Sequence, residues 1–173
     1  MKKEFIFNNQ AEELFPAVQE MMSFIGSRDS AAIQLISSRC KVILTELLTN
    51  GIKHAVVAPT VFTITLDGHS LKIVKSGHGT PFLPDHVGKP DPAGEAGRRI
   101  VISSDPIADL YVVKENLYRL RFGVSDHPIT DDLQVDALVE HYGLLLITKA
   151  SDRFFYEFKP EAGLNVFSSY VLF

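Results

Sequence analysis

The composition of the chain indicates one folded domain and excludes several classes of protein. Its 173 residues are 46% hydrophobic, with 17 basic and 21 acidic side chains and a net charge of −4, so it can bury a core without cross-links. No block of Lys and Arg stands out, so we expect no nucleic-acid partner. No apolar run approaches the roughly 20 residues that span a bilayer, so we expect no membrane association. The lone Cys40 excludes an intramolecular disulfide, and the start lacks a signal-like apolar run, which together predict a cytoplasmic protein.

The first elements in chain order are expected to be a strand and a helix. Residues 2–7, KKEFIF, alternate in a way that predicts a strand. Asn9, with Glu12 three residues later, is typical of a capped helix start. Apolar residues then recur at helical spacing through residue 26.

A longer helix and a hairpin follow. Asp29 or Ser30 is expected to cap a second helix that runs to about Ala55. The run TVFTITLDGHSLKIVKSG then predicts two strands joined by a turn at Asp67 and Gly68.

The second half of the chain predicts a loop, another hairpin, a helix and two final strands. Residues 79–98 contain four of the nine prolines and are expected to be a loop. Residues 109–123 predict a hairpin that turns at 114–116, and the stretch 130–152 favours helix. RFFYEFKP and LNVFSSYVLF are expected to be the last strands. The whole pattern predicts an α+β fold over residues 1–173, a two-layer sandwich of one mixed, mainly antiparallel sheet and one layer of helices.

A narrow polar stripe marks the second predicted helix. In TELLTNGIKHA, Glu46, Asn50 and Lys53 fall at i, i+4 and i+7, with His54 at the edge of the same stripe. One interpretation is the solvated face of an amphipathic helix. The other is a site, because a carboxylate can orient a hydroxyl, an amide oxygen suits Mg²⁺, and a lysine can meet a phosphate.

Two glycine-containing stretches could complete such a site. In KSGHGTPF, Gly77 and Gly79 form a turn that lets the backbone approach a flat ligand, or only a loop at the end of a strand. In YGLLLI, Gly143 opens a short apolar helix whose first N–H groups suit phosphate oxygens, or it merely admits a bend.

The order and spacing of these three pieces resemble the GHKL superfamily of ATPases, and most of all its small bacterial anti-sigma-factor serine kinases. The resemblance covers about residues 30–82 and 140–171. It implies a Bergerat-like sandwich that binds ATP and Mg²⁺, with Glu46 as the polarising base and Asn50 as the metal ligand. Cofactor contacts implied by the resemblance fall on Asn50, Lys53, His54, Lys75, Gly77, Gly79, Gly143 and Leu144.

The chain departs from the family pattern at several positions. Lys75 stands where the family has the Asp that accepts a hydrogen bond from the adenine amine, and lysine has donors only. Leu164 follows Gly163 where the family has a supporting Thr, and His141 replaces a glycine of the second box. The stretch 83–135, with its predicted hairpin, lies where the family keeps a mobile lid, which predicts an atypical insertion.

Three functions follow from the resemblance and the departures. The first is an ATP-binding regulator, including a serine kinase, whose partner is a sigma factor or an anti-sigma antagonist. The second is a pseudo-ATPase of the same fold that acts only through protein contacts. The third is an altered-base site, in which Lys75 donates to a keto oxygen such as that of guanine. A homodimer is a further open alternative.

Overall fold

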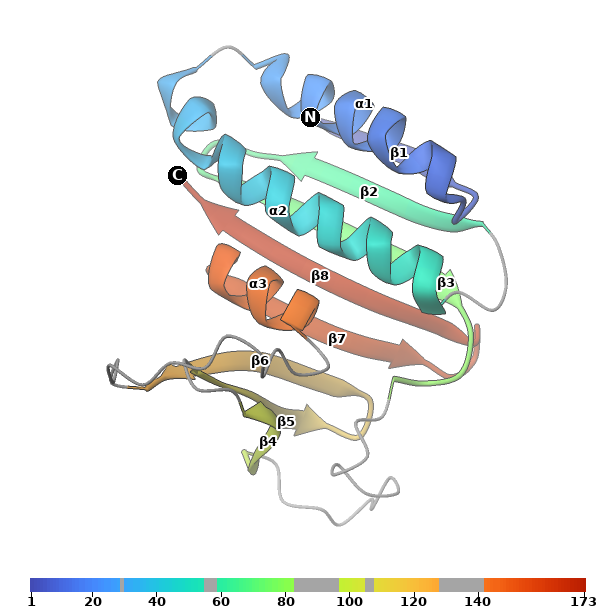
Figure 1. The fold of residues 1–173 in the computed structure, drawn as a ribbon, viewed down its shortest axis with the longest axis vertical. Coiled ribbons are helices and arrows are strands. Elements are labelled where there is room, and N and C mark those ends of the chain that lie inside the picture. Colours follow the sequence, from blue (N-terminus) through green and yellow to red (C-terminus); the bar gives the residue numbers. More distant parts are fainter. Residues whose placement is uncertain (29, 55–58, 83–96, 105–107, 128–141) are drawn as a thin grey trace.

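The computed structural model describes residues 1–28, 30–54, 59–82, 97–104, 108–127 and 142–173. Within these ranges, one sheet has the strand order β1-β2-β3-β8-β7-β6-β5-β4, and the helices cover one of its faces (Figure 1). The strands are β1 (Lys2–Phe7), β2 (Thr60–Leu66), β3 (Ser70–His78), β4 (Arg99–Ser104), β5 (Ala108–Asn116), β6 (Arg119–Asp126), β7 (Arg153–Lys159) and β8 (Leu164–Leu172). The helices are the short 3-10 helix η1 (Ala11–Glu13), α1 (Leu14–Gly26), α2 (Ala31–His54) and α3 (Tyr142–Ala150).

The long helix α2 forms as its sequence predicts. Ser30 caps it, because the Ser30 Oγ accepts a hydrogen bond from the Ile33 N–H at 3.2 Å. Asp29 and Ala55, the other expected limits, lie outside the described residues. One side of α2 is buried against the sheet and its neighbouring helices, through Ile33, Ile36, Cys40, Ile43, Leu44, Leu47, Leu48 and Gly51.

The expected cap at Asn9 is wrong. η1 begins without any side-chain cap, and α1 follows it directly. Asn9 instead adopts a left-handed backbone, with φ of 60°, and its Oδ1 accepts a hydrogen bond from the Thr60 Oγ1 at 2.8 Å. The Asn9 side chain thus bonds to a residue 51 positions away in sequence instead of capping the helix that follows it. The local capping pattern could not indicate this bond, because it involves only neighbouring residues.

The sheet confirms the α+β class and corrects the expectation of a mixed sheet. Every strand pairing among the described residues is antiparallel. The hairpin of β2 and β3 turns where predicted, because Asp67 Oδ1 accepts hydrogen bonds from the His69 and Ser70 N–H groups at 3.1 and 2.8 Å. Short turns of this kind join strands that run in opposite directions.

The predicted insertion belongs to the main sheet. Its hairpin, β5 and β6, turns at Leu117 and Tyr118, slightly beyond the expected position. β6 pairs with β7, and a further strand that the sequence did not indicate, β4, pairs with β5. Residues 83–96 and 128–141 of the expected loop and helix lie outside the described residues. The three extra strands therefore extend the sheet beyond β7.

Ionic and hydrogen-bonded contacts fasten the helical layer to the sheet. The Arg39 Nε on α2 donates to the Ala150 carbonyl at the end of α3, at 2.8 Å. The Arg39 Nη2 lies 2.8 Å from Asp152 Oδ2, just before β7. α2 and α3 are thereby held side by side over the centre of the sheet (Figure 1). None of the helices in the described ranges is long and apolar enough to cross a membrane.

Candidate functional site

The polar stripe of α2 faces the first turn of α3. A Cβ atom placed on Gly143 would lie 2.6 Å from Glu46 Oε2 and 3.7 Å from Asn50 Oδ1. Two residues of α2 and one of α3, almost 100 positions apart in sequence, therefore lie next to one another. Glycine at 143 is required for this close approach, since a side chain there would displace the Glu46 carboxylate.

Lys75 occupies a position on the inner face of the sheet that its neighbours fill with apolar side chains. On the adjacent strands it is paired with Phe62 of β2 and Phe167 of β8. Its Nζ lies 5.9 Å from the centroid of the Phe167 ring and 3.7 Å from the Cβ position of Gly51 on α2. Lys75 thus extends into the space between α2 and the sheet.

The Lys75 side chain is only partly buried, and no carboxylate of the described residues forms a salt bridge with its ammonium. Within the described part of the chain, its Nζ makes no hydrogen bond and no salt bridge. Burial lowers its pKa from 10.5 to about 8, because the charged form loses its hydration. Partial burial therefore makes the charged form of Lys75 less stable in the folded protein than it is in water.

Asn9, two residues after the end of β1, also approaches Gly51. A Cβ atom on Gly51 would lie only 2.8 Å from Asn9 Oδ1. Because that oxygen accepts from Thr60, the Asn9 Nδ2 points elsewhere, and it is buried without a hydrogen-bond partner. Asn9 was not a predicted site residue, and nothing in its local sequence could reveal the contact with Gly51.

The glycine turn after β3 is fastened to the last two strands. The Gly79 N–H donates to the Gly163 carbonyl at 3.4 Å, and Asn165 Nδ2 donates to the Thr80 carbonyl at 3.0 Å. The Phe82 N–H donates to the Tyr156 Oη at 2.8 Å. This turn is therefore held by specific bonds to β7 and β8.

An aromatic cluster fills the inner face next to Lys75. The Phe82 ring lies 5.4 Å from Tyr156 and 5.9 Å from Phe167, between ring centroids. Burial raises the pKa of Tyr156 to about 12, and its hydroxyl donates to Asn165 Oδ1 at 2.7 Å. The cluster places aromatic side chains next to Lys75 on the inner face of the sheet.

The other residues that the sequence assigned to cofactor binding differ in their burial and in the elements that hold them. Lys53 and His54 are exposed in the last turn of α2. Leu144 is buried in the core, so its side chain is a packing residue. Gly77 lies on the inner face of β3, where a Cβ would be 3.4 Å from Thr60 Oγ1.

Of the two other departures noted in the sequence, Leu164 is described by the structure and His141 is not. Leu164 pairs with His78, and the alternation of the strand places it on the face opposite to Phe167. The inner-face position at this level of β8 belongs to Asn165, which lies opposite Gly77. His141 lies outside the described residues.

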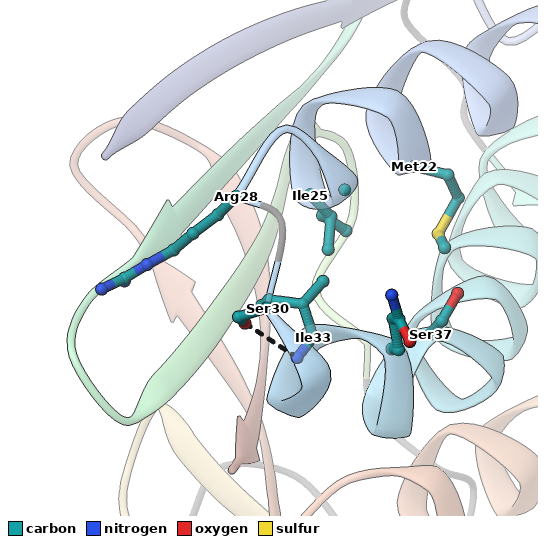
Figure 2. A pocket seen from close by; sticks show the side chains of 8 residues that line it. Met22, Ile25, Arg28, Ser30, Ile33 and Ser37 are labelled. Carbon is teal, nitrogen blue, oxygen red and sulfur yellow. Dashed lines mark hydrogen bonds between the residues drawn. The ribbon is translucent and has the colours of Figure 1, made fainter.

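A separate hollow lies at the other end of α2. It has a volume of about 130 Å³ and is lined by Met22, Ile25, Gly26, Arg28, Ser30, Ile33, Gln34 and Ser37. Figure 2 shows the Arg28 side chain extending away from this hollow and Ser30 bonded to Ile33. At a rise of about 1.5 Å per residue, Ser37 is roughly 14 Å along the helix from Glu46, so the hollow is distinct from the candidate site.

The sequence matches no protein-family model, and no curated protein matches it. Among the described residues, no group of three or more His, Cys, Asp or Glu side chains could hold a metal ion. The candidate site is thus the pair of glycine-lined contacts that α2 makes, one with Gly143 and one with Lys75 and Asn9.

Proposed function

We propose that the chain is a regulatory binding module of GHKL-like build that does not use ATP and acts through contacts with a protein partner. The main support for this proposal is the position of the Lys75 side chain, which lies between Gly51 of α2 and Phe167 of β8. In the family that the sequence resembles, this position recognises the adenine amine through a carboxylate. A lysine offers only donors, so two donor groups would face each other and adenine would lose its recognition.

A second candidate is the ATP-binding serine kinase, and a different observation favours it. Glu46 and Asn50 both direct oxygens toward Gly143, and carboxylate and amide oxygens are ligands that Mg²⁺ prefers, so these residues fit the ion. Asn50 would hold it, and the bound ion would neutralise phosphate charge. Glu46 would accept the proton of the serine hydroxyl as its oxygen bonds to the γ-phosphorus and ADP leaves.

A melting experiment with nucleotides separates the two candidates. A ligand that binds the native state raises the melting temperature according to RT ln(1 + [L]/Kd). We expect Mg-ATP at millimolar concentration to leave the wild-type melt unchanged. A rise with Mg-ATP that disappears in Asn50→Ala and in Glu46→Ala would overturn the binding module and support the kinase.

A Lys75→Asp variant tests the reason for the absence of ATP binding. If lysine at this position is what excludes adenine, Lys75→Asp should gain a melting shift with Mg-ATP that wild type lacks. Lys72→Asp, on the opposite face of the same strand, is the matched control and should gain none. A rise with Mg-GTP in the wild type, but not with Mg-ATP, would instead support the altered-base site.

A further inference from the structure

The face of the sheet that points away from the helices carries a surplus of positive charge. Side chains alternate between the two faces along each strand, and Phe155 marks the outer face, where it pairs with Ser168 of β8 and Arg121 of β6. From β3 across to β4, the strands place three acids on this face, Asp109, Glu115 and Glu157, against six basic residues, Lys72, Arg99, Arg119, Arg121, Arg153 and Lys159. The chain as a whole has a net charge of −4, so the charge of this face is opposite in sign to that of the protein.

The acids of the outer face are already engaged. Glu115 Oε2 lies 2.9 Å from Arg119 Nε, and its Oε1 lies 3.6 Å from Arg121 Nε. Glu157 Oε2 lies 3.6 Å from Arg119 Nη1, and Asp109 is bonded by side chains beside it. No salt bridge to a residue that the structure describes is formed by the other four cations of this face, Lys72, Arg99, Arg153 and Lys159.

One of these cations is held in place by an aromatic ring. The Arg99 Cζ lies over the Tyr111 ring, 3.7 Å from its centroid. A Cβ atom on Gly123 of β6 would collide with the same ring, so the glycine lets Tyr111 lie against the neighbouring strand. Arg99 remains exposed, and a guanidinium stacked on a ring keeps its N–H groups free to bind a carboxylate.

The middle of the outer face repeats this arrangement. The Arg119 Cζ lies 4.5 Å from the centroid of the Phe155 ring, and Phe155 packs edge-on against Tyr170 at 5.9 Å between centroids. The Lys72 Nζ lies 5.1 Å from the Tyr170 ring centroid. Rings beneath the cations restrict their motion before any ligand arrives, which lowers the entropy lost on binding.

We propose that this outer face, from Lys72 on β3 to Arg99 on β4, is a docking surface for an acidic segment of a protein partner. The proposal rests on the proposed function, because it gives the partner of that binding module a surface and a chemistry. Its basis is charge complementarity: exposed cations without acidic partners stand in fixed positions on several strands, and carboxylates are the groups that complete them.

The acids among the cations favour a protein partner over a nucleic acid. A nucleic acid carries a phosphate charge at every nucleotide, so its backbone would pass close to Glu115 and Glu157. A protein segment can place single carboxylates beside Arg99 and Arg153 and neutral residues beside the acids. The adjoining outer positions of β2 and β3, such as Thr63 and its pair Val74, are uncharged, as in mixed protein interfaces.

The test uses the whole chain and a fluorescein-labelled peptide in which Glu alternates with Ser, since alternate residues of an extended peptide point to the same side. The same peptide with Gln in place of Glu is its control. We expect the Glu peptide to bind at low salt, more weakly as salt rises, and the Gln peptide not to bind. Fluorescence anisotropy measures both.

Paired variants locate the binding on the outer face. Arg99→Gln combined with Arg153→Gln should weaken the Glu peptide about tenfold at low salt, since two exposed ion pairs are lost. Lys41→Gln combined with Lys149→Gln changes the net charge equally on α2 and α3 and should leave the affinity unchanged.

An NMR readout on the wild type does not depend on the folding of any variant. The Nε–H signal of Arg99, assigned by its loss in Arg99→Gln, should move when the Glu peptide is added. The Nε–H signal of Arg39, which donates to the Ala150 carbonyl on the helical side, should not move.

Three outcomes would overturn the docking surface. They are no binding of the Glu peptide at low salt, an equal loss of affinity in both paired variants, and tighter binding of an oligouridylate RNA than of the peptide. The proposed function fails separately, through a Mg-ATP shift that depends on Asn50. A Glu peptide without effect would leave the exclusion of ATP standing.

Discussion

The two glycine contacts of α2 are built alike and differ in the charge that they bring to the helix. At Gly143, the missing side chain makes room for the oxygens of Glu46 and Asn50; at Gly51, it makes room for Asn9 and the Lys75 ammonium. The first contact presents two acceptor oxygens, and the second brings the acceptor Asn9 Oδ1 and the donor Lys75 Nζ to the same glycine. One helix thus meets a pair of acceptor oxygens at Gly143 and a lysine ammonium at Gly51, within about one turn. The contrast teaches that two close approaches of the same kind, each allowed by a glycine, can bring a carboxylate to one side of a helix and an ammonium to another.

The largest expected effect comes from removing the charge of Lys75. A pKa lowered from 10.5 to about 8 by burial corresponds to roughly 3 kcal/mol of destabilisation of the charged form. Lys75→Met should therefore raise the free energy of unfolding at pH 7 by roughly 2 to 3 kcal/mol. Urea denaturation measures this change.

The pH dependence of stability checks the same assignment. Because the folded pKa of Lys75 lies below 10.5, the unfolded chain binds more protons between about pH 8 and 10.5. The free energy of unfolding of wild type, relative to Lys75→Met, should rise through this window. Lys72→Met serves as the control. Parallel pH curves for wild type and Lys75→Met would contradict the desolvated ammonium.

Asn9→Ala should have the next largest effect. The change removes the hydrogen bond from Thr60, which lies at 2.8 Å, and places alanine at a φ of 60°. These losses add to roughly 1 to 3 kcal/mol of stability. Asn9→Gly loses the bond but tolerates the backbone, so its thermal melt should lie between those of wild type and Asn9→Ala. If the two variants melt at the same temperature, the backbone of Asn9 is not left-handed.

The same substitution at the two glycines gives the smallest effect and the most direct comparison. Alanine is favoured over glycine inside a helix by about 1 kcal/mol. At Gly143, the obstructing atom is the end of the flexible Glu46 side chain, so Gly143→Ala should be neutral or stabilising. At Gly51, the obstructing atom belongs to the short Asn9 side chain, which is held by Thr60, so Gly51→Ala should lower stability by roughly 1 kcal/mol.

A double-mutant cycle identifies the cause of this difference. In an Asn9→Gly background, the obstruction at residue 51 is gone, so Gly51→Ala should become neutral or stabilising. Chemical denaturation of the four proteins in the cycle gives the coupling energy. A cost of Gly51→Ala that is the same in both backgrounds would assign it to another neighbour, such as Phe7, 3.6 Å from the Cβ position.

Much of the fold could be predicted from the sequence because its signals are local. The alternation in KKEFIF, the Ser30 cap and the Asp67 turn each operate over a few residues, and each element forms where the pattern indicates. The approach of Glu46 and Asn50 to Gly143 was also predicted, but from a resemblance and not from periodicity. β4 was missed because its single short run carries no turn or hairpin signal that marks it as a strand.

The sequence by itself determined the class of fold, the amphipathic α2 and the placing of Glu46 and Asn50 one turn apart, because a helix fixes the spacing of its own residues. Only the tertiary structure decided that Asn9 bonds Thr60 instead of capping a helix, that the extra strands join the main sheet, and that Asn165 rather than Leu164 faces inward. Each of these outcomes depends on strand register or on contacts between distant segments. Such contacts are set by packing the whole core at once, and no local pattern contains them.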